Sequence, residues 1–408
     1  MYNHSELMSS VGLIGLGVIG GNLAYNLQRT RDVHVYERSP EKVKSIANSS
    51  PKIKGYNDIE SFVDGMDTPR TIFTSLPNGD ATDSVVNTLL KKLDPNDTMI
   101  DTSNEHYRTS RVRGSKCNSR GVNYVGAGLS GGAVGALTGP ALMIGCEEKV
   151  FDENQELFSS FCRNYIHMGN DYGIGHFTKM VHNGVEYGML QGVADVFSYC
   201  NQDTHYMSET LHRVMDTDAN GYIVNSAKKV IGEYNLSNIL DVAEMNNTGS
   251  WTSQIALEYE IPTPVLNASL NARLTSRDVK ALNVNQHLNY AFDSGIGAST
   301  LRFVFAMALI EGFKVMNTRN VDKRKTMNAW SNGTIIDCPM ITSNCYNILE
   351  ETVDDARIFV MYCTSASIPC PAVQAALTQF DFIHQRKTSI NFLMAQRNFF
   401  GQHSIIEK

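Results

Sequence analysis

The sequence predicts an α/β domain followed by an all-α domain and a C-terminal tail. In the first part of the chain, short apolar runs alternate with segments of helical periodicity, as in a parallel sheet covered by helices. The alternation stops near residue 178, and long amphipathic segments follow. We therefore expect the three parts to span residues 1–178, 179–388 and 389–408.

The first predicted strand, Val11–Ile14, runs directly into the glycine-rich turn 15–20, and a helical pattern follows at 21–27. The glycines fit the spacing G-x-G-x-x-G, in which one permits a tight turn, one lets the backbone approach a pyrophosphate, and one allows close helix–strand packing. Free N–H groups at the start of such a helix suit phosphates. We therefore predict a Rossmann-type dinucleotide-binding domain rather than a purely structural turn. The candidate cofactor-binding residues of the turn are Gly15, Gly17, Val18, Ile19 and Gly20.

The second predicted strand, 33–36, ends in Glu37, Arg38 and Ser39, which are further candidate cofactor contacts. An acidic side chain at this position usually accepts hydrogen bonds from a free adenosine ribose, which favours NAD. An arginine pairs with a 2′-phosphate, which favours NADP. The two residues stand side by side, so the sequence indicates both coenzymes. A salt bridge between them is the structural alternative.

Two later strands place further candidates at the same edge of the sheet. The run 71–76 ends in Leu76, just before a proline–asparagine–glycine breaker, beside the expected cofactor. The run 98–101 is followed by Asn104, which we predict to contact substrate or nicotinamide, although asparagine after a strand is also ordinary turn chemistry. A later glycine-rich stretch offers a hydroxyl and backbone N–H groups to a carboxylate or hydroxyls, with a flexible loop as the alternative. Its residues are Ser130, Gly131 and Gly132.

One predicted helix carries the densest set of polar groups in the chain. At about 100° per residue, five polar side chains between 176 and 187 fall on one helix face, while the apolar residues lie largely on the other side. These residues are Lys179, His182, Asn183, Glu186 and Tyr187. A lysine with a neighbouring carboxylate and partial burial can be tuned toward acid–base work. The alternative is a solvated polar face that carries a Lys–Glu ion pair.

Composition argues against several function classes. A formal net charge of −7 disfavours nucleic acid as a main partner. The eight cysteines are scattered singly, without zinc-ligand spacing, and we expect the closest pair, Cys363 and Cys370, to be buried thiols. The apolar run 301–313 predicts a core helix that is too short and too interrupted to span a membrane. No export signal is evident at the N-terminus, so we expect a cytoplasmic protein, and we expect no metal site.

The order and identity of these segments resemble the 6-phosphogluconate dehydrogenase family, within the β-hydroxyacid dehydrogenase superfamily. The matching stretches cover most of the chain in the correct order, which is far more specific than any single motif. They are residues 15–23, 100–107, 125–145, 176–188, 248–253, 271–276, 330–336 and 395–403. The typical family member is longer, so we expect shortened loops or helices in the second half.

The resemblance implies oxidative decarboxylation of 6-phospho-D-gluconate to ribulose 5-phosphate and carbon dioxide, with reduction of NADP; NAD remains possible because of Glu37. In that reaction Lys179 takes the proton of the 3-hydroxyl as hydride leaves C3, and later donates to the carbonyl oxygen during decarboxylation. Glu186 then protonates C1. Such chemistry needs two groups with separated pKa values and no metal. His182 and Asn183 orient the C3 hydroxyl and the sugar.

The resemblance also assigns both ends of the substrate and an assembly. The carboxylate end is held by the serine–glycine–glycine segment, and the phosphate end by a tyrosine, a lysine and two arginines. The implied substrate contacts are Asn104, Ser130, Gly131, Gly132, Tyr187, Arg273, Arg397 and His403. In the family the helical part forms a homodimer and the tail reaches into the partner subunit, so Arg397 and His403 would act in trans.

The chain departs from the family at the phosphate end. Two lysines of a Lys-Gly-Thr-Gly-Lys-Trp segment are replaced by Asn246 and Ser250. Loss of one charge-assisted contact weakens phosphate binding by about 1.5–3 kcal/mol, or roughly ten- to a hundred-fold. Two alternatives therefore stay open: a β-hydroxyacid dehydrogenase with a different, less phosphate-dependent substrate, and a non-catalytic dinucleotide-binding paralogue.

Overall fold

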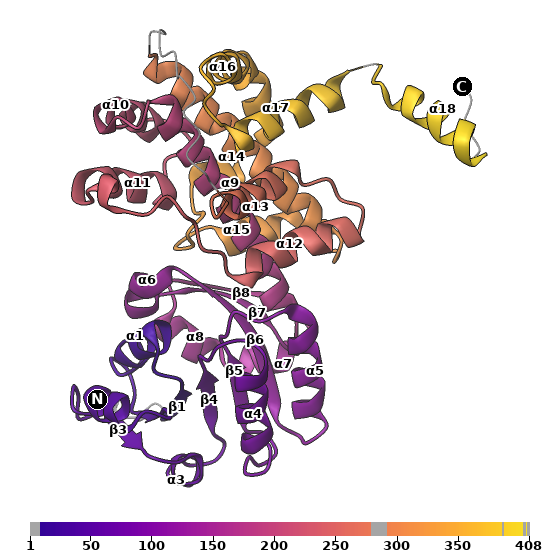
Figure 1. Ribbon diagram of the computed structural model, residues 1–408. Helices are drawn as coiled ribbons and strands as arrows, with labels where there is room; N and C mark the ends of the chain where they lie inside the picture. The colour runs from indigo at the N-terminus through magenta and orange to yellow at the C-terminus, as the bar shows by residue number, and fades with distance from the viewer. Residues whose placement is uncertain (1–8, 279–291, 386, 403–404, 406–408) are drawn as a thin grey trace, which may run out of the picture.

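The computed structural model describes residues 9–278, 292–385, 387–402 and 405, and joins an α/β domain to an all-helical domain (Figure 1). The α/β domain holds one eight-stranded sheet in the order β3-β2-β1-β4-β5-β6-β7-β8. Its first six strands are parallel, β7 is antiparallel to β6, and β8 is parallel to β7. The strands are β1 (Val11–Ile14), β2 (Val33–Tyr36), β3 (Ile53–Tyr56), β4 (Thr71–Thr74), β5 (Thr98–Asp101), β6 (Asn123–Ser130), β7 (Ala141–Gly145) and β8 (Asn164–Gly169). This architecture confirms the predicted fold class.

Helices cover both faces of the sheet. Neighbouring residues of one strand enter different apolar layers: Leu13 packs in one and Ile14 in the other. A strand buried on both faces reads as a continuous apolar run, which is why these short strands are visible in the sequence. The helices of this domain are α1 (Val18–Leu27), α2 (Pro40–Ala47), α3 (Ile59–Asp64), α4 (Asp80–Leu89), α5 (Tyr107–Asn118), α6 (Gly132–Thr138), α7 (Glu148–Glu153) and α8 (Gln155–Phe161).

Some local expectations need correction. Helix α1 begins at Val18 rather than at residue 21. Gly20 serves packing inside this helix, since a Cβ there would lie 1.9 Å from the carbonyl oxygen of Gly15. Strand β4 ends at Thr74 and not at residue 76. The alternative of a flexible loop around Ser130 is wrong, because this residue ends strand β6 and is buried.

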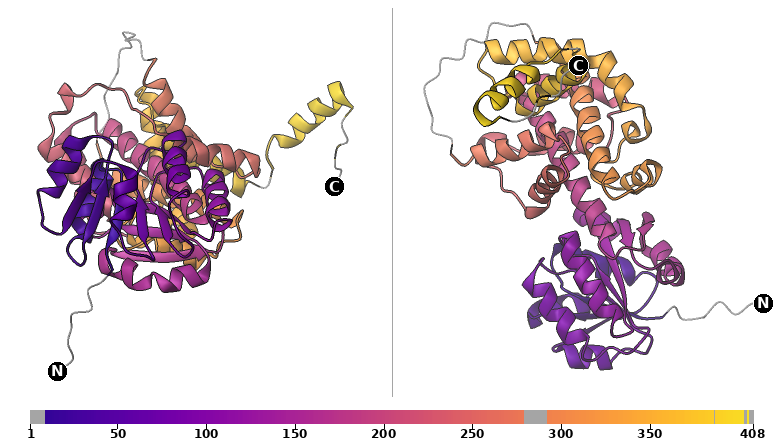
Figure 2. Two further views of the ribbon diagram at one scale, coloured as in Figure 1. Left: turned by 90° about the horizontal axis from the view of Figure 1, so that it is seen from below. Right: turned by 90° about the vertical axis from the view of Figure 1, so that its right-hand side faces the viewer.

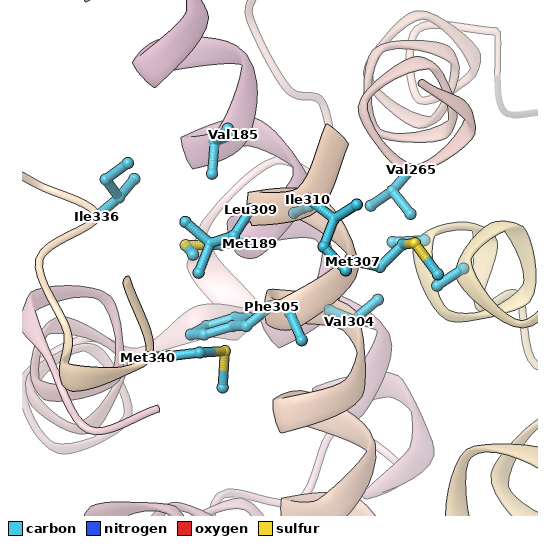
Figure 3. Packing of buried hydrophobic residues seen from close by; sticks show 14 of the residues in the cluster. Val185, Met189, Val265, Val304, Phe305, Met307, Leu309, Ile310, Ile336 and Met340 are labelled. Atoms are coloured by element: carbon cyan, nitrogen blue, oxygen red, sulfur yellow. The ribbon is translucent and has the colours of Figure 1, made fainter. Parts of the chain in front are cut away.

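The helical domain follows, with α9 and α14 at its centre. Figure 3 shows Val185 and Met189 of α9 packed near Phe305 and Leu309 of α14. The helices are α9 (Ile174–Tyr199), α10 (Thr204–Met215), α11 (Tyr222–Glu233), α12 (Asn247–Glu258), α13 (Pro264–Thr275), α14 (Ser294–Asn317), α15 (Lys323–Trp330), α16 (Cys345–Ser365), α17 (Pro371–His384) and α18 (Ile390–Gly401). Short 3-10 helices lie at Leu236–Asn238 and Pro339–Thr342.

Helix α14 confirms the predicted core helix and extends beyond the run 301–313 in both directions. By length and composition alone it is long and apolar enough to cross a membrane, so the expectation that it is too short does not hold for the whole helix. Most of its apolar stretch is buried inside the protein, and core helices of soluble proteins meet the same criterion.

Buried carboxylates hold helix starts inside this domain. Glu311 of α14 is fully buried and accepts hydrogen bonds from the backbone N–H groups of Val265 (3.0 Å) and Leu266 (3.1 Å), at the start of α13. Burial raises the pKa of Glu311 to about 8. Because α13 carries Arg273, this contact helps to position that arginine.

Helix α9 crosses from one domain into the other. Its first turns lie on β6 and β7, and its later turns pack against α12, α13 and α14. Gly128 permits this approach, since a Cβ there would lie 2.4 Å from the Cβ of Lys179. The predicted domain boundary at residue 178 falls inside this helix and remains a prediction.

The eight cysteines are all free thiols, and each is buried except Cys162, which is partly exposed. Cys363 and Cys370 are both buried, which confirms the prediction. Among the residues that the structure describes, no group of three or more His, Cys, Asp or Glu side chains is arranged to hold a metal ion.

A buried network of charges supports the loops that follow β4 and β5. Arg113 of α5 contacts the carboxylates of Asp83 (2.6 Å), Asp101 (3.1 Å) and Glu105 (2.7 Å). Glu105 also accepts a hydrogen bond from the backbone N–H of Gly79 (2.9 Å). The network therefore ties together the two loops that meet at the carboxyl edge of the sheet.

We expect Arg113→Met to lower the free energy of unfolding by about 3–5 kcal/mol, because Asp101 and Glu105 would be left buried without a cationic partner. Urea unfolding followed by circular dichroism measures the change. The matched control is Lys92→Met, which breaks an exposed ion pair with Glu60 (3.3 Å) and should cost less than about 1 kcal/mol. Equal losses in the two variants would contradict a structural role for the network.

Candidate functional site

The polar face of α9 is buried where the two domains meet. Lys179, His182, Asn183 and Tyr187 are between 0 and 7% exposed. The side chain of Glu186 is 21% exposed. The alternative of a solvated polar face is therefore wrong.

The amine of Lys179 sits in a closed set of polar contacts. Its Nζ lies 3.1 Å from Ser130 Oγ and 3.3 Å from His182 Nδ1. Ser130 Oγ lies 3.3 Å from His182 Nε2 and accepts a hydrogen bond from the backbone N–H of Ile335 (3.3 Å). Strand β6, helix α9 and the segment after α15 thus meet at one hydroxyl group.

The contacts of Lys179 suit both protonation states of its amine. An uncharged amine accepts the hydroxyl proton of Ser130 and donates to His182 Nδ1, while Ser130 Oγ accepts from the N–H groups of His182 Nε2 and Ile335. A charged amine donates to Ser130 Oγ when His182 carries its proton on Nδ1, which lies 3.2 Å from Asn183 Oδ1, and the Ser130 hydroxyl then donates to Nε2. The hydrogen bonds therefore allow Lys179 to exchange a proton without a buried group losing its partner.

The electrostatics agree with such a proton exchange. Burial lowers the pKa of Lys179 to about 8, although the charge of Glu186 acts in the opposite direction. Burial, with the charge of Lys179, also places the pKa of His182 well below its usual range, so the imidazole is neutral. A lysine that loses its proton near neutral pH can act as a general base.

Glu186 provides the complementary group. Its carboxylate lies 3.8 Å from His182 Nδ1, one turn along the same helix. Burial raises the pKa of Glu186, against the opposing charges of Lys179 and Arg273. A lysine with a lowered pKa and a carboxyl with a raised pKa form the separated pair that acid–base chemistry requires.

A chain of side-chain hydrogen bonds links α9 to the start of α12. Asn183 Nδ2 donates to Thr248 Oγ1 (3.0 Å), which donates to Asn246 Oδ1 (2.5 Å). The hydroxyl of Tyr187 also donates to Asn246 Oδ1 (3.0 Å). Arg273 lies with its guanidinium carbon 3.9 Å from the centre of the Tyr187 ring. Tyr187, Arg273 and the divergent Asn246 therefore lie together at the predicted phosphate end of the site.

The tail residues do not join Tyr187, Arg273 and Asn246 within one chain. Arg397 is exposed on α18, which projects away from the helical domain (Figures 1 and 2). His403 lies outside the described residues. Within one chain, therefore, the predicted site lacks Arg397. The other divergent position, Ser250, lies one turn into α12, where its hydroxyl donates to the carbonyl oxygen of Asn247 (2.8 Å).

The three glycines of the first turn have three different surroundings. Gly15 has a φ of +96°, and a Cβ there would lie 2.3 Å from the carbonyl oxygen of Ser75. A Cβ on Gly20 would meet the backbone of Gly15. Gly17 faces open space, with no atom within 4 Å of where a Cβ would be. This is the division into turn, approach and packing that a pyrophosphate site at the start of α1 requires.

Glu37 faces the same turn. Its carboxylate accepts hydrogen bonds from the backbone N–H groups of Leu16 (3.1 Å) and Arg38 (2.8 Å). The salt-bridge alternative does not hold among the described residues, since Glu37 and Arg38 form no ion pair and Arg38 is exposed. Ser39 caps α2 by accepting from the N–H of Lys42 (3.4 Å).

The remaining candidates line the same edge. Val18 is 71% exposed at the start of α1, while Ile19 and Leu76 are partly buried. Asn104 is exposed after β5. Gly131 and Gly132, at the start of α6, take φ angles of +113° and +62°.

Sequence reasoning missed three contributors. Thr248 belongs to a segment that matched the family, but no role was predicted for it. The backbone of Ile335 approaches Ser130 from 205 residues away, which no local pattern reveals. The Arg113 network under the loops is equally non-local.

Comparison with protein families matches nearly the whole chain. The NAD binding domain of 6-phosphogluconate dehydrogenase matches residues 10–169. The 6-phosphogluconate dehydrogenase C-terminal domain matches residues 175–344 and 338–407.

Curated relatives are similar over their full length. The NADP(+)-dependent, decarboxylating 6-phosphogluconate dehydrogenase of Bacillus subtilis (strain 168) is 28% identical over 453 residues, covering 97% of this chain and 96% of that protein. The decarboxylating 6-phosphogluconate dehydrogenase of Staphylococcus aureus (strain N315) is 28% identical over 461 residues, covering 98% and 97%.

Solved structures share the fold. The 6-phosphogluconate dehydrogenase of Plasmodium falciparum, studied in apo form and with NADP+ and 6-phosphogluconate, gives a TM-score of 0.86 at 23% identity over 98% of both chains. The 3-hydroxyisobutyrate dehydrogenase of Mycobacterium tuberculosis gives a TM-score of 0.54 at 19% identity, over 67% of this chain and 94% of that one.

Proposed function

Because the chain belongs to the 6-phosphogluconate dehydrogenase family, we propose that it is an oxidoreductase that converts 6-phospho-D-gluconate to ribulose 5-phosphate and carbon dioxide. The observation that carries this proposal is the buried Lys179 amine, which contacts Ser130 and His182 and has a pKa of about 8. A buried lysine with a purely structural role would form an ion pair with a carboxylate. Lys179 forms no ion pair among the described residues, and its lowered pKa allows it to accept a proton near neutral pH.

Lys179 and Glu186 carry out the proton transfers of this reaction. The neutral amine of Lys179 accepts the proton of the substrate's 3-hydroxyl, while the bound dinucleotide supplies the hydride acceptor. The product of this step is a β-keto acid, which loses carbon dioxide as Lys179, now an ammonium, donates its proton to the C3 oxygen. Glu186, whose pKa burial raises, then gives a proton to C1 of the enediol, while Lys179, neutral again, takes the enediol hydroxyl proton so that the ketone forms. Asn183, held by Thr248, orients the sugar.

A second candidate function is a β-hydroxyacid dehydrogenase with a less phosphate-dependent substrate. Asn246 favours it, since a neutral amide stands beside Tyr187 and Arg273 where the family has a lysine. Arg273 opposes it, because its guanidinium remains available to a phosphate.

We expect Asn246→Lys to lower the KM for 6-phosphogluconate by roughly ten- to a hundred-fold, because an added ammonium makes a charge-assisted contact with the phosphate. The KM for unphosphorylated gluconate should stay unchanged. The matched control is Asn247→Lys, which adds the same charge one residue away. An unchanged KM for both acids in Asn246→Lys would place the substrate phosphate elsewhere.

For the coenzyme we propose NADP, with NAD as the competitor. The exposed Arg38 makes no ion pair among the described residues and is therefore free to contact a 2′-phosphate. Glu37 opposes this preference, because its carboxylate favours a free ribose. The glycine turn suits the pyrophosphate of either coenzyme.

We also propose a homodimer. Helix α18 has no buried residue within one chain, and Phe392, Phe399 and Phe400 are 65, 89 and 78% exposed. An apolar cavity of about 520 Å³ lies between the start of α13 and one face of α17, and Pro264, Pro371 and Phe382 are among its lining residues. Apolar surface of this extent is typical of a subunit interface. A cytoplasmic location stays a prediction.

The test measures reduced-nicotinamide formation with 6-phosphogluconate or gluconate as substrate, each with NADP and NAD. Turnover of 6-phosphogluconate supports the proposal. The ratio of kcat/KM with NADP to kcat/KM with NAD shows whether Arg38 or Glu37 dominates the coenzyme preference. Turnover of gluconate alone favours the second candidate. Dinucleotide binding without turnover of either acid would indicate a non-catalytic dinucleotide-binding paralogue.

A further inference from the structure

A polar cavity of about 410 Å³ lies where the end of β8, the start of α5 and the segment between α14 and α15 come together. Its charged lining residues are Arg111, Asp171, Arg319, Asp322 and Lys325. None of these residues belongs to the cofactor or substrate site described above. The size is that of a small-molecule site.

The positive charge of Arg319 is only partly offset, because it contributes to the lowered pKa of Asp171 without an ion pair to that carboxylate. Its guanidinium carbon lies 4.7 Å from the ring centre of Tyr107, 5.4 Å from that of Phe177 and 5.2 Å from that of Tyr259. It also donates a hydrogen bond to the Tyr107 hydroxyl. Within the described part of the chain it forms no ion pair, and its buried Nε has no hydrogen-bond partner. Aromatic faces hold the cation in place without neutralising it.

The other charges leave the cavity positive. Arg111 and Asp171 neutralise each other in an ion pair. Asp322 is exposed and caps α15 by accepting from the backbone N–H of Lys325 (3.1 Å). The ammonium of Lys325 has no carboxylate partner in the described residues. Two cations therefore face one remaining carboxylate, in a chain whose formal net charge is −7.

We propose that this cavity is a second binding site, distinct from the catalytic centre, for a small anion that carries a phosphate or carboxylate group. A planar guanidinium held by aromatic rings and a flexible ammonium beside it make charge-assisted hydrogen bonds to such groups. The binding site joins both domains, since Arg111 comes from the α/β domain and Arg319 and Lys325 from the helical domain.

The aromatic rings around Arg319 connect the cavity to α9, the helix that carries the candidate catalytic residues. Phe177 lies in α9, Tyr107 begins α5, and Tyr259 is the C-cap of α12. Asp171 also accepts a hydrogen bond from the N–H of Gly173 (2.9 Å), at the start of α9. A ligand that binds only the folded protein raises its thermal stability by mass action, which gives a readout independent of activity.

The experiment compares the full chain with Lys325→Gln and Arg324→Gln, using inorganic phosphate and succinate as separate probes in calorimetric titration and thermal unfolding. Arg324 is the matched control, because it is an exposed neighbour with the same charge that does not line the cavity. We expect Lys325→Gln to bind at least one probe roughly tenfold more weakly, while Arg324→Gln binds as the wild type does.

The two probes distinguish the ligand group. A response to phosphate alone assigns a phosphate ligand, and a response to succinate alone assigns a carboxylate. Phosphate bound near Arg273 is common to all three proteins and cancels in the comparison. Lys325→Glu, which reverses the charge, should abolish the cavity-dependent response. Equal affinities of wild type, Lys325→Gln and Lys325→Glu for both probes would overturn the proposal.

Discussion

Lys179→Met is expected to lower kcat for 6-phosphogluconate by roughly 10²- to 10⁴-fold, toward the upper end, because the same amine serves both oxidation and decarboxylation. Methionine reproduces the lysine side chain as far as Cε, including its packing against Gly128, but has no amine to accept a proton. Steady-state rates of nicotinamide reduction measure the loss. Lys149→Met, on the surface of α7, is the matched control and should retain full activity.

The role of Lys179 as a base also predicts how activity depends on pH. The amine must be neutral to accept the proton, and its pKa is about 8, so kcat/KM should fall about tenfold per pH unit below pH 8 and level off above it. A flat profile through this range would contradict the assignment of Lys179 as the base.

The same lysine destabilises the folded protein at neutral pH. The pKa of Lys179 is lower in the folded than in the unfolded chain, so its contribution to stability is lost as pH falls from about 10.5 to about 8. At pH 7, Lys179→Met should therefore raise the free energy of unfolding by up to roughly 3 kcal/mol. An inactive variant with an unchanged or higher melting temperature excludes misfolding as the cause.

Removal of residues 389–408 is expected to abolish both dimer formation and activity. The deletion takes away Arg397 and α18, whose exposed phenylalanines would be covered by the partner subunit in the proposed dimer. Sedimentation velocity measures the assembly, and the nicotinamide assay measures activity. A truncated protein that stays dimeric and active would contradict the proposed role of the tail.

Mixing two inactive variants tests whether Arg397 acts in trans. Lys179→Met and Arg397→Ala each lose activity as homodimers. If the tail completes the partner's site, each mixed dimer has one site with both residues intact. Random pairing should then restore about one quarter of wild-type activity, whereas a site built within one chain would regain none.

Most of the α/β domain could be predicted from the sequence because its signals are local. Strands such as Val11–Ile14 are buried on both faces and read as apolar runs, and the glycines at 15, 17 and 20 each meet a distinct steric demand. Element ends were less predictable. The sequence assigns Gly20 to the turn, but it packs against Gly15 inside α1, which begins at Val18.

The candidate site was predictable to the extent that it lies on one helix. A repeat of 3.6 residues places Lys179, His182, Asn183, Glu186 and Tyr187 on one face without any tertiary knowledge. The partners of that face come from distant parts of the chain. Ser130, Thr248 and Ile335 meet it only because β6, α12 and the segment after α15 fold around α9.

By itself, then, the sequence determined the fold class, the glycine turn and the polar face, because each depends on residue spacing within one element. Only the tertiary structure decided that this face is buried, that Lys179 contacts Ser130 and His182 rather than solvent, and that Glu37 binds backbone N–H groups rather than the Arg38 guanidinium. Burial depends on what other elements cover, and burial shifts the pKa values of Lys179 and Glu186 in opposite directions.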